Sequence, residues 1–280
     1  MKNYSSSYLD ADVYELNSVL DASLTTTLAE ALAPIAPAPG LQQRLMARVT
    51  RSAAANMGIT TVRAEQGVWR ELAAGVRSCT QHSEAAIQFT LIELAAGVSW
   101  SLGAQLHELT PGPAVHECLV LRGEVQLVAP ALGSPFLQLH DYQLIGREAA
   151  WLPGAQLISS KGARLAWRSS ALGSEFGPTQ ASHRVRADAS GWRHLVPGVE
   201  FKRLHVLNGR ISMLLRFETG ATLPAHPHRL GEEGLMVQGE GFLGDVLLRE
   251  GEFQYAAAGT THAKLFTDVG CVLFVSGAVA

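Results

Sequence analysis

Four residues in the C-terminal part of the chain have types and spacings that suit metal binding: His226, His228, Glu232 and His262. Side chains on a β-strand alternate between its two faces, so His226 and His228 point the same way. Glu232 follows after a short turn, and His262 returns from a later strand. Imidazole nitrogens and carboxylate oxygens suit zinc, iron, manganese, nickel or copper. We predict that these residues hold a single divalent metal ion, with zinc favoured over iron, manganese or nickel, and that a small-molecule ligand binds at the metal.

The competing interpretation is that these histidines are ordinary core or surface residues. A single histidine in a β-rich chain usually has a structural role, and an HxH pair alone is a weak signal. Here the pair is combined with a glutamate at a suitable offset, with turn glycines at Gly220 and Gly239, and with a later histidine. This combination favours a metal site. Glu233 alternates to the opposite face from Glu232, where we expect it to face solvent or to support a metal ligand.

The segments around these residues have the pattern of short β-strands. From about Val62 onwards, apolar runs of period two alternate with turn residues, as in IQFTLIEL, CLVLRGEVQLV and CVLFVSG. This pattern indicates an all-β sandwich or barrel. The runs also repeat. AAIQFTLIELAAG, which ends at Gly97, resembles GRISMLLRFETG, which ends at Gly220, and ECLVLRGEV around Gly123 resembles EGLMVQGEG around Gly239. Two such copies predict two barrels in one chain.

The first ~56 residues have a different pattern. Apolar residues recur at helical spacing from Leu16 to Leu32, PIAPAPG at 34–40 interrupts them, and LQQRLMARV is again helical. We expect a helix, a stiff linker and a second helix, which either pack on the main domain or a second subunit or dock a partner. The predicted domains are a helical extension with a Pro-rich linker (1–58), a first barrel (59–172) and a metal-binding second barrel (173–280).

The segment from Gly220 resembles a known family. GATLPAHPHRLGEEGLMVQG and the stretch that leads to His262 resemble the two sequence motifs of the cupin superfamily, over about 50 residues. The first motif is complete, whereas in the second Ala257 replaces the usual proline and Phe266 replaces a common asparagine. Neither position is a metal ligand. The context HPHRLGEEGLMVQGEGFLGD followed by GCVLFVSG looks most like the ChrR-type cupins. The resemblance implies two cupin (jelly-roll) β-barrels after the helical N-terminal extension.

The ChrR resemblance implies a sensory or regulatory function. In that family such a domain is often fused to a zinc-dependent anti-sigma domain that responds to oxidative stress, which makes a sigma factor the implied partner. ALAPIAPAPGLQQRLMARV also resembles the linker of such anti-sigma factors. However, residues 1–60 contain no His and no Cys, so the HxxxCxxC zinc motif is missing. Either the sigma-binding module was lost or it docks a partner without zinc.

The alternative function is enzymatic. Some ChrR-like cupins resemble diketone-cleaving dioxygenases, which implies a metal-dependent cupin dioxygenase acting on a small carbonyl or diketone compound. The sequence shows no clear general base apart from the ligands, so the metal would supply most of the chemistry. No catalytic residue is identified beyond the four ligands, and whether the chain is an enzyme stays open.

The first repeat lacks most of the ligand set. Alignment of the turn glycines places His116 where Glu232 stands, whereas Gly103, Gln105 and Ile158 take the positions of the three histidines. We therefore predict a degenerate, metal-free cupin domain that packs on the active one. A site rescued by His107 and Glu117 is the open alternative. The remaining histidines have no motif around them and are expected on the surface or in loops: His82, His140, His183, His194 and His205.

Composition excludes several classes of protein. Hydrophobic residues make up 47% of the chain and charged residues 17%, with a formal net charge of −3. A disordered chain, a nucleic-acid partner and a membrane partner are therefore not expected. The low charge predicts a homo-oligomer such as a dimer. The three cysteines, Cys79, Cys118 and Cys271, form no CxxC pair, and the N-terminus has no secretory signal, so we expect a cytoplasmic protein.

Overall fold

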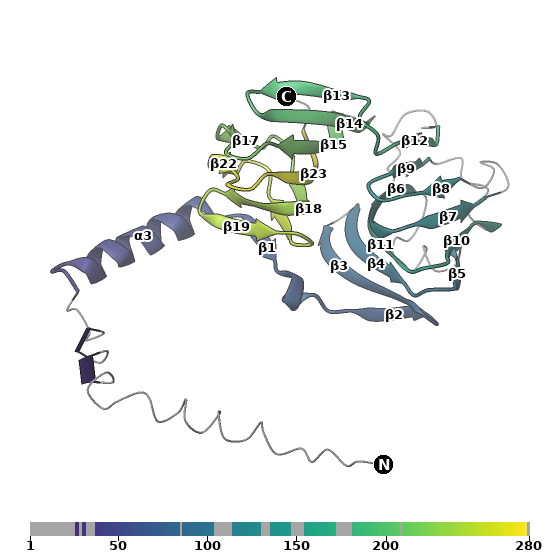
Figure 1. Cartoon of the computed structure of the whole chain (residues 1–280). Helices are drawn as coiled ribbons and strands as arrows, with labels where there is room; N and C mark the ends of the chain where they lie inside the picture. The colour runs from purple at the N-terminus through teal and green to yellow at the C-terminus, as the bar shows by residue number, and fades with distance from the viewer. Residues whose placement is uncertain are drawn as a thin grey trace, which may run out of the picture. The chain divides into compact units, whose positions relative to one another are not determined.

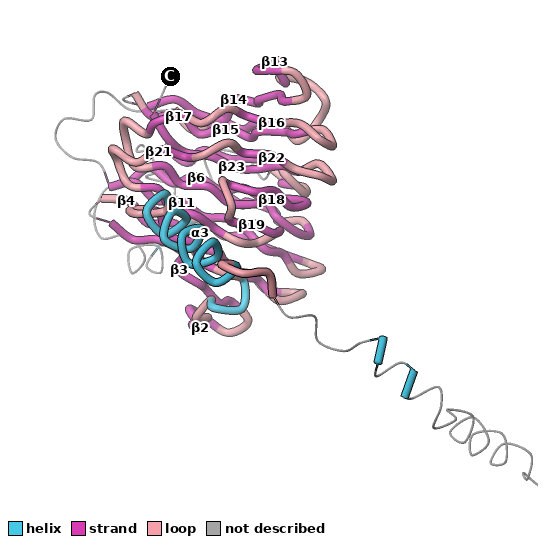
Figure 2. The backbone as a smooth tube through the Cα atoms, turned by 90° about the vertical axis from the view of Figure 1, so that its left-hand side faces the viewer, coloured by secondary structure: helices cyan, strands magenta, loops and turns pink. Residues whose placement is uncertain are grey.

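A computed structural model shows a chain built mainly from β-strands (Figure 2). It divides into two compact units, Met1–Arg51 and Ser52–Ala280. The predicted helix between Leu16 and Leu32 lies almost entirely outside the residues that the structure describes. Those residues are 26–27, 30–31, 37–84, 86–103, 114–129, 135–146, 154–171, 181–207 and 209–278.

The predicted second helix is confirmed as α3 (Leu41–Ala55). It begins directly after the Pro-rich segment, where Gly40 has a positive φ of 75° and its carbonyl accepts a hydrogen bond from the Arg44 N–H. The apolar face of α3 is open, because Leu45, Met46 and Val49 are each at least half exposed. In the described part of the chain, no helix is both long and apolar enough to cross a membrane.

The first repeat forms two sheets around a core. A seven-stranded sheet has the order β12-β9-β6-β11-β4-β3-β2, and a four-stranded sheet has the order β5-β10-β7-β8. Trp100 and Leu157 from the small sheet share a buried cluster with Leu165 and Trp167 from the large one. The strands are β2 (Arg70–Ala73), β3 (Val76–Glu84), β4 (Ile87–Leu94), β5 (Val98–Ser101), β6 (Ala114–Gly123), β7 (Val125–Val128), β8 (Phe136–Leu137), β9 (Tyr142–Ile145), β10 (Gln156–Ser159), β11 (Ala163–Ala171) and β12 (His183–Val185).

The second repeat is arranged in the same way. Its main path runs β1-β20-β18-β23-β15-β14-β13, with β16, β19 and β22 attached, and β17 pairs with β21 separately. Leu215, Met236 and Leu273 lie in its buried core. The strands are β1 (Ile59–Val62), β13 (Trp192–Val196), β14 (Val199–Leu207), β15 (Arg210–Phe217), β16 (Thr222–Leu223), β17 (His226–Pro227), β18 (Glu232–Leu243), β19 (Val246–Arg249), β20 (Phe253–Ala256), β21 (Thr261–His262), β22 (Leu265–Phe266) and β23 (Cys271–Ala278).

A third core joins the two large sheets face to face. Strand alternation creates it: on β23, Leu273 and Val275 enter the core of the second repeat, whereas Phe274 on the opposite face packs toward the first repeat. Phe274 lies 5.8 Å from Phe89 between ring centroids, and Phe253 lies 4.8 Å from Phe89. Aromatic rings at such separations contribute beyond their buried area. The two repeats are therefore one continuously packed body.

Two strands belong to the sheet of the other repeat. β1 precedes the first repeat in the chain but lies beside strands of the second repeat (Figure 1). It pairs with β20, with Thr61 opposite Gln254. Conversely, β12 precedes the second repeat but pairs with β9 of the first. Each repeat thus contributes one strand to its neighbour's sheet. The all-β fold with an N-terminal helix is as predicted, whereas this exchange has no signature in the periodicity.

Candidate metal centre

Two very short strands position the ligand set. His226 on β17 lies directly opposite His262 on β21 in an antiparallel pair. The backbone N–H of His228 donates to the carbonyl of Thr260 at 2.9 Å, which continues the pairing past Pro227. Proline has no N–H to donate, so it suits the solvent-facing edge of such a short strand. Glu232 begins β18, directly after the turn that follows His228.

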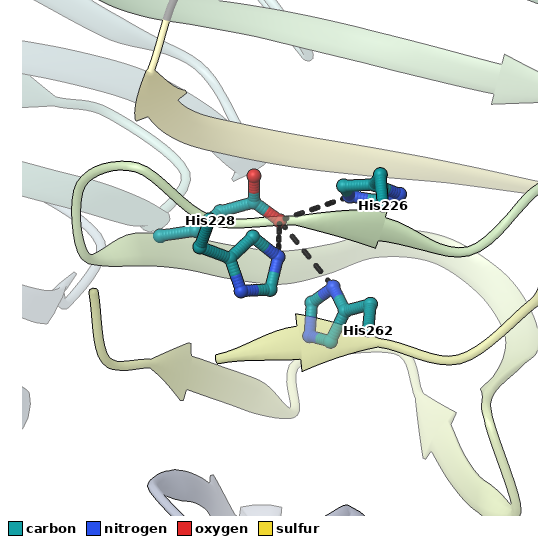
Figure 3. A group of neighbouring side chains, drawn as sticks. His226, His228 and His262 are labelled. Atoms are coloured by element: carbon teal, nitrogen blue, oxygen red, sulfur yellow. Dashed lines mark ion pairs between the residues drawn. The ribbon is translucent and has the colours of Figure 1, made fainter. Parts of the chain in front are cut away.

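All four predicted residues meet at one point, where they could hold a metal ion. The Oε1 atom of Glu232 lies 3.9 Å from His226 Nε2, and 3.5 Å from both His228 Nε2 and His262 Nδ1 (Figure 3). The four ligand atoms lie within 4.8 Å of one another. His228 and His262 are buried, and His226 and Glu232 are partly exposed at the cavity.

Hydrogen bonds fix which nitrogen of each imidazole is free. His226 Nδ1 lies 3.1 Å from the carbonyl of Pro224, which can only accept, so Nδ1 carries the proton. His228 Nδ1 lies 2.9 Å from the hydroxyl of Thr260, whose own proton is donated to the Ala257 carbonyl at 2.6 Å. Nδ1 of His228 is therefore also the donor. In both residues the unprotonated Nε2 faces Glu232, as a metal ligand requires.

His262 uses its other nitrogen. Its Nε2 donates to the amide oxygen of Gln254 at 3.0 Å, which leaves Nδ1 free to face Glu232. Within the described residues, His228 Nε2 and His262 Nδ1 are buried atoms without a hydrogen-bond partner. Such orphaned nitrogens are costly unless something binds them. The lone pairs of these nitrogens converge beside a carboxylate, so the residues fit a divalent metal ion.

Electrostatics at the site favour an ionised carboxylate. Burial opposes ionisation of Glu232, but the three imidazoles that face its carboxylate, those of His226, His228 and His262, outweigh it and hold its pKa far below the usual range. The same contact with Glu232 raises the pKa of His226. In His262, burial dominates and lowers the pKa. A metal ion would replace the protons that the carboxylate otherwise attracts to these imidazoles.

A cavity of about 480 Å³ opens onto the four residues. Its walls are mainly aliphatic, and among the described lining residues the exposed Arg229 is the one basic side chain. A cavity of this kind matches ligands that bury an apolar body and place a few polar atoms precisely. The aliphatic wall includes Leu195, Met213, Leu215, Leu223, Leu243, Leu265, Leu273 and Val275.

The equivalent position in the first repeat has different chemistry. His116 on β6 is buried, with Nδ1 at 2.9 Å from the hydroxyl of Ser169, and burial lowers its pKa to about 4. Glu117 does not join it, which contradicts the rescue alternative: its carboxylate accepts from Arg168 at 2.6 Å and from Tyr142 at 2.8 Å on the opposite face. Gln105 and His107 lie outside the described residues. A metal-free first repeat stays a prediction.

Three sequence interpretations need correction or addition. Glu233 does occupy the face opposite to Glu232, but it is 1% exposed and paired with Arg168, so the expectation that it faces solvent is wrong. His205 was expected on the surface or in a loop but is buried in β14. Gln254 and Thr260, which orient two ligands, were missed. Their only sequence signal is an alternation that places Gln254 on the cavity face of β20.

Known proteins share the fold of this chain. Residues 180–279 match the family described as the ChrR cupin-like domain. The second repeat therefore resembles a ChrR cupin-like domain. A protein of Pseudomonas aeruginosa, provisionally described as glyoxylate-induced, is 14% identical with a TM-score of 0.61 over 79% of this chain and 89% of that one. No curated protein matches the chain by sequence.

Two further solved structures share the cupin fold over most of the chain. A cupin 2 conserved barrel domain protein from Leptotrichia buccalis has a TM-score of 0.55 at 11% identity, covering 79% of this chain and 94% of that one. A protein of Nostoc punctiforme, provisionally described as a dioxygenase, has a TM-score of 0.56 at 14% identity, covering 79% and 87%. At these identities the likeness extends to the fold of both repeats and not to function.

Proposed function

We propose that this chain is a metal-binding regulatory protein of the ChrR type, in which one divalent ion on His226, His228, Glu232 and His262 senses a small molecule or an oxidant. The observation that carries the proposal is the set of three imidazoles whose unprotonated nitrogens face a single carboxylate oxygen. This set lies inside the segment that matches the ChrR cupin-like domain. Zinc is the favoured ion, since it accepts nitrogen and oxygen ligands in a tetrahedral site.

The cavity defines the kind of ligand that the site would sense. When bound, the metal would supply a Lewis-acid position for an oxygen atom of the ligand. The leucine-rich wall would bury an apolar body and exclude water, and Arg229 at the exposed rim could pair with a negative group. A compact apolar molecule with one or two adjacent oxygen atoms fits this arrangement. A small dianion would place most of its charge against aliphatic side chains, and burying a charge without a partner is unfavourable.

A sigma factor is the proposed partner. Residues 1–60 carry no His or Cys, so the contact would be made without zinc. α3 offers apolar side chains for it, because Leu45, Met46 and Val49 are exposed. A change at the metal would shift the equilibrium between bound and free partner, as in other ligand-controlled switches.

Pull-down with sigma factors from the same cell tests the regulatory proposal. The zinc-loaded chain should retain one sigma factor and release it after the metal is removed with a chelator; the iron-loaded chain tests an oxidant, because zinc itself has no redox change. The His262→Ala variant is the matched control, since it should not respond to either treatment. If no sigma factor is retained with any metal or redox state, the regulatory proposal is wrong.

A dioxygenase acting on a small carbonyl or diketone compound is the second candidate. The open apolar cavity beside the ligand set favours it, because a diketone could place two oxygens at the metal. Among the described lining residues, none apart from the ligands is suited to act as a general base, since Gln254 is a neutral amide that accepts from His262. Oxygen uptake by the iron-loaded protein with a panel of diketones tests this function. If none of the diketones causes oxygen uptake, the dioxygenase function is wrong.

A further inference from the structure

Three side chains from three strands form a hydrogen-bonded line that ends at a metal ligand. His262 Nε2 on β21 donates to Gln254 Oε1 on β20 at 3.0 Å. Gln254 Nε2 in turn donates to the hydroxyl of Thr61 on β1, also at 3.0 Å. Gln254 is 2% exposed and His262 is 5% exposed, so water cannot readily replace these partners. Gln254 is thereby tied to a residue 193 positions away in the chain.

The register of the sheet explains why these residues meet. Thr61 lies directly opposite Gln254, and Gly234 of β18 lies opposite Gln254 on its other side. Gly234 has no side chain to compete for the amide. Residues of β1 alternate between faces, so Thr61 shares the cavity face with Gln254, whereas its neighbour Thr60 is exposed.

Thr61 supports the orientation in which the amide oxygen of Gln254 reaches the histidine. If the amide were reversed, its NH₂ group would face His262 Nε2, which would then have to accept instead of donate. The proton of the imidazole would move to Nδ1, the atom that must be free to bind a metal. The hydroxyl of Thr61 accepts from the amide NH₂ when Oε1 faces His262, so it satisfies the buried amide in the orientation that a metal-bound His262 requires. Thr61 therefore stabilises the metal-binding tautomer of the ligand through Gln254.

β1 is anchored on both sides of Thr61. Before it, the Gly58 carbonyl accepts from the Ala257 N–H at 2.9 Å. After it, Arg63 Nη1 pairs with Glu252 Oε2 at 2.8 Å. In sequence, α3 ends at Ala55 and β1 begins at Ile59. The N-terminal extension is thus joined by a short connection to the strand that carries Thr61.

We propose that Thr61 and Gln254 are positioning residues for the metal ligand His262, and that the pairing of β1 with β20 couples metal occupancy to the order of β1, the strand that follows the N-terminal extension in the chain. The inference rests on the proposed metal site. Coupling of this kind is reciprocal: if an ordered β1 strengthens metal binding, bound metal must stabilise β1.

Zinc affinity of the full chain, measured by competition with a chromogenic chelator, tests the positioning role. Thr61→Val removes the hydroxyl at nearly constant shape and should weaken zinc binding about 10-fold, and Gln254→Leu should weaken it about 10- to 100-fold. Thr61→Ser keeps the hydroxyl and should restore affinity to within about 2-fold of wild type. Thr60→Val, on the same strand but facing away, is the matched control and should bind as wild type.

Hydrogen exchange of the β1 amides supplies the second measurement. Zinc should slow exchange at residues 59–62 in wild type and in Thr60→Val, and should do so much less in Thr61→Val. Equal zinc affinity and equal protection in Thr61→Val and Thr60→Val would overturn the inference while the metal site itself stands. If wild type binds no zinc, the metal site and the inference fail together. A failure to capture a sigma factor bears on neither measurement.

Discussion

Arg168 of the first repeat donates its Nε hydrogen to Glu233 of the second repeat across 2.5 Å. Its Nη1 donates to Glu117 at 2.6 Å, and Arg210 lies 3.8 Å from Glu233. The side chains of Arg168, Glu117 and Glu233 are each at least 95% buried between the two large sheets. Burial opposes ionisation of Glu117, but the nearby Arg168 outweighs it and lowers the pKa. The interface between the two repeats therefore contains a network of buried ion pairs within an apolar core.

Removal of Arg168 should destabilise the protein strongly. A buried ion pair contributes little net stability, yet loss of one partner leaves an uncompensated charge, which costs roughly 3–5 kcal/mol. Arg168→Met should lower the free energy of unfolding in urea by about that amount. Lys161→Ala is the control, because its pair with Glu124 is mostly exposed and should contribute no more than about 1 kcal/mol. Similar losses in the two variants would show that the network is not structurally important.

Equivalent turn glycines should be equally intolerant of alanine in both repeats. A Cβ on Gly239 would lie 2.4 Å from the Gly270 carbonyl, and one on Gly123 would lie 2.1 Å from the Gly162 carbonyl. Gly209 has the same positive φ, but a Cβ there would meet nothing within 4 Å.

Gly209→Ala should therefore cost only the left-handed strain of about 1–2 kcal/mol. Gly239→Ala and Gly123→Ala should each cost about 2 kcal/mol more, because a backbone carbonyl must move. Urea denaturation of the three variants measures the difference. Equal costs at all three positions would contradict the close approach seen in both repeats.

Protonation of His116 should destabilise the fold at mildly acidic pH. Its pKa is lowered by burial to about 4, whereas an unfolded histidine titrates near 6.5. Below pH ~6.5, His116 binds a proton in the unfolded chain but not in the folded chain. The free energy of unfolding therefore falls as the pH drops toward 4. The difference between the folded and unfolded pKa values corresponds to a loss of roughly 3 kcal/mol in the free energy of unfolding.

His116→Gln supplies the comparison, because glutamine can still bond Ser169 but does not titrate. The difference in unfolding free energy between wild type and this variant should change steadily from pH 6.5 to 4 and be constant above pH 7. Parallel pH profiles for the two proteins would show that His116 is not held neutral.

The ligand set could be predicted because its information is local. HxH spacing places two imidazoles on one face of a strand, and the turn glycines fix where the chain returns. Alternation also placed Glu233 on the opposite face correctly. Alternation could not show which residue packs against that face. The residue is Arg168, which lies 65 positions earlier in the other repeat.

The remaining features of the site depend on contacts between residues that are far apart in the sequence. Thr61 meets Gln254 only because β1 leaves its own repeat and joins the sheet of the other. Periodicity defines a strand and its two faces, but it does not name the strand that will lie beside it. The roles of Thr61 and Gln254 therefore become visible only when the sheet order is known.

Elemental analysis of protein purified without chelators or a His-tag tests the central claim most directly. About one divalent ion per chain is expected, because the four residues form a single ligand set. His226→Ala and His262→Ala should each lose the ion, and His116→Ala should keep it. A wild-type protein without metal, or a metal content that survives both ligand substitutions, would contradict the account.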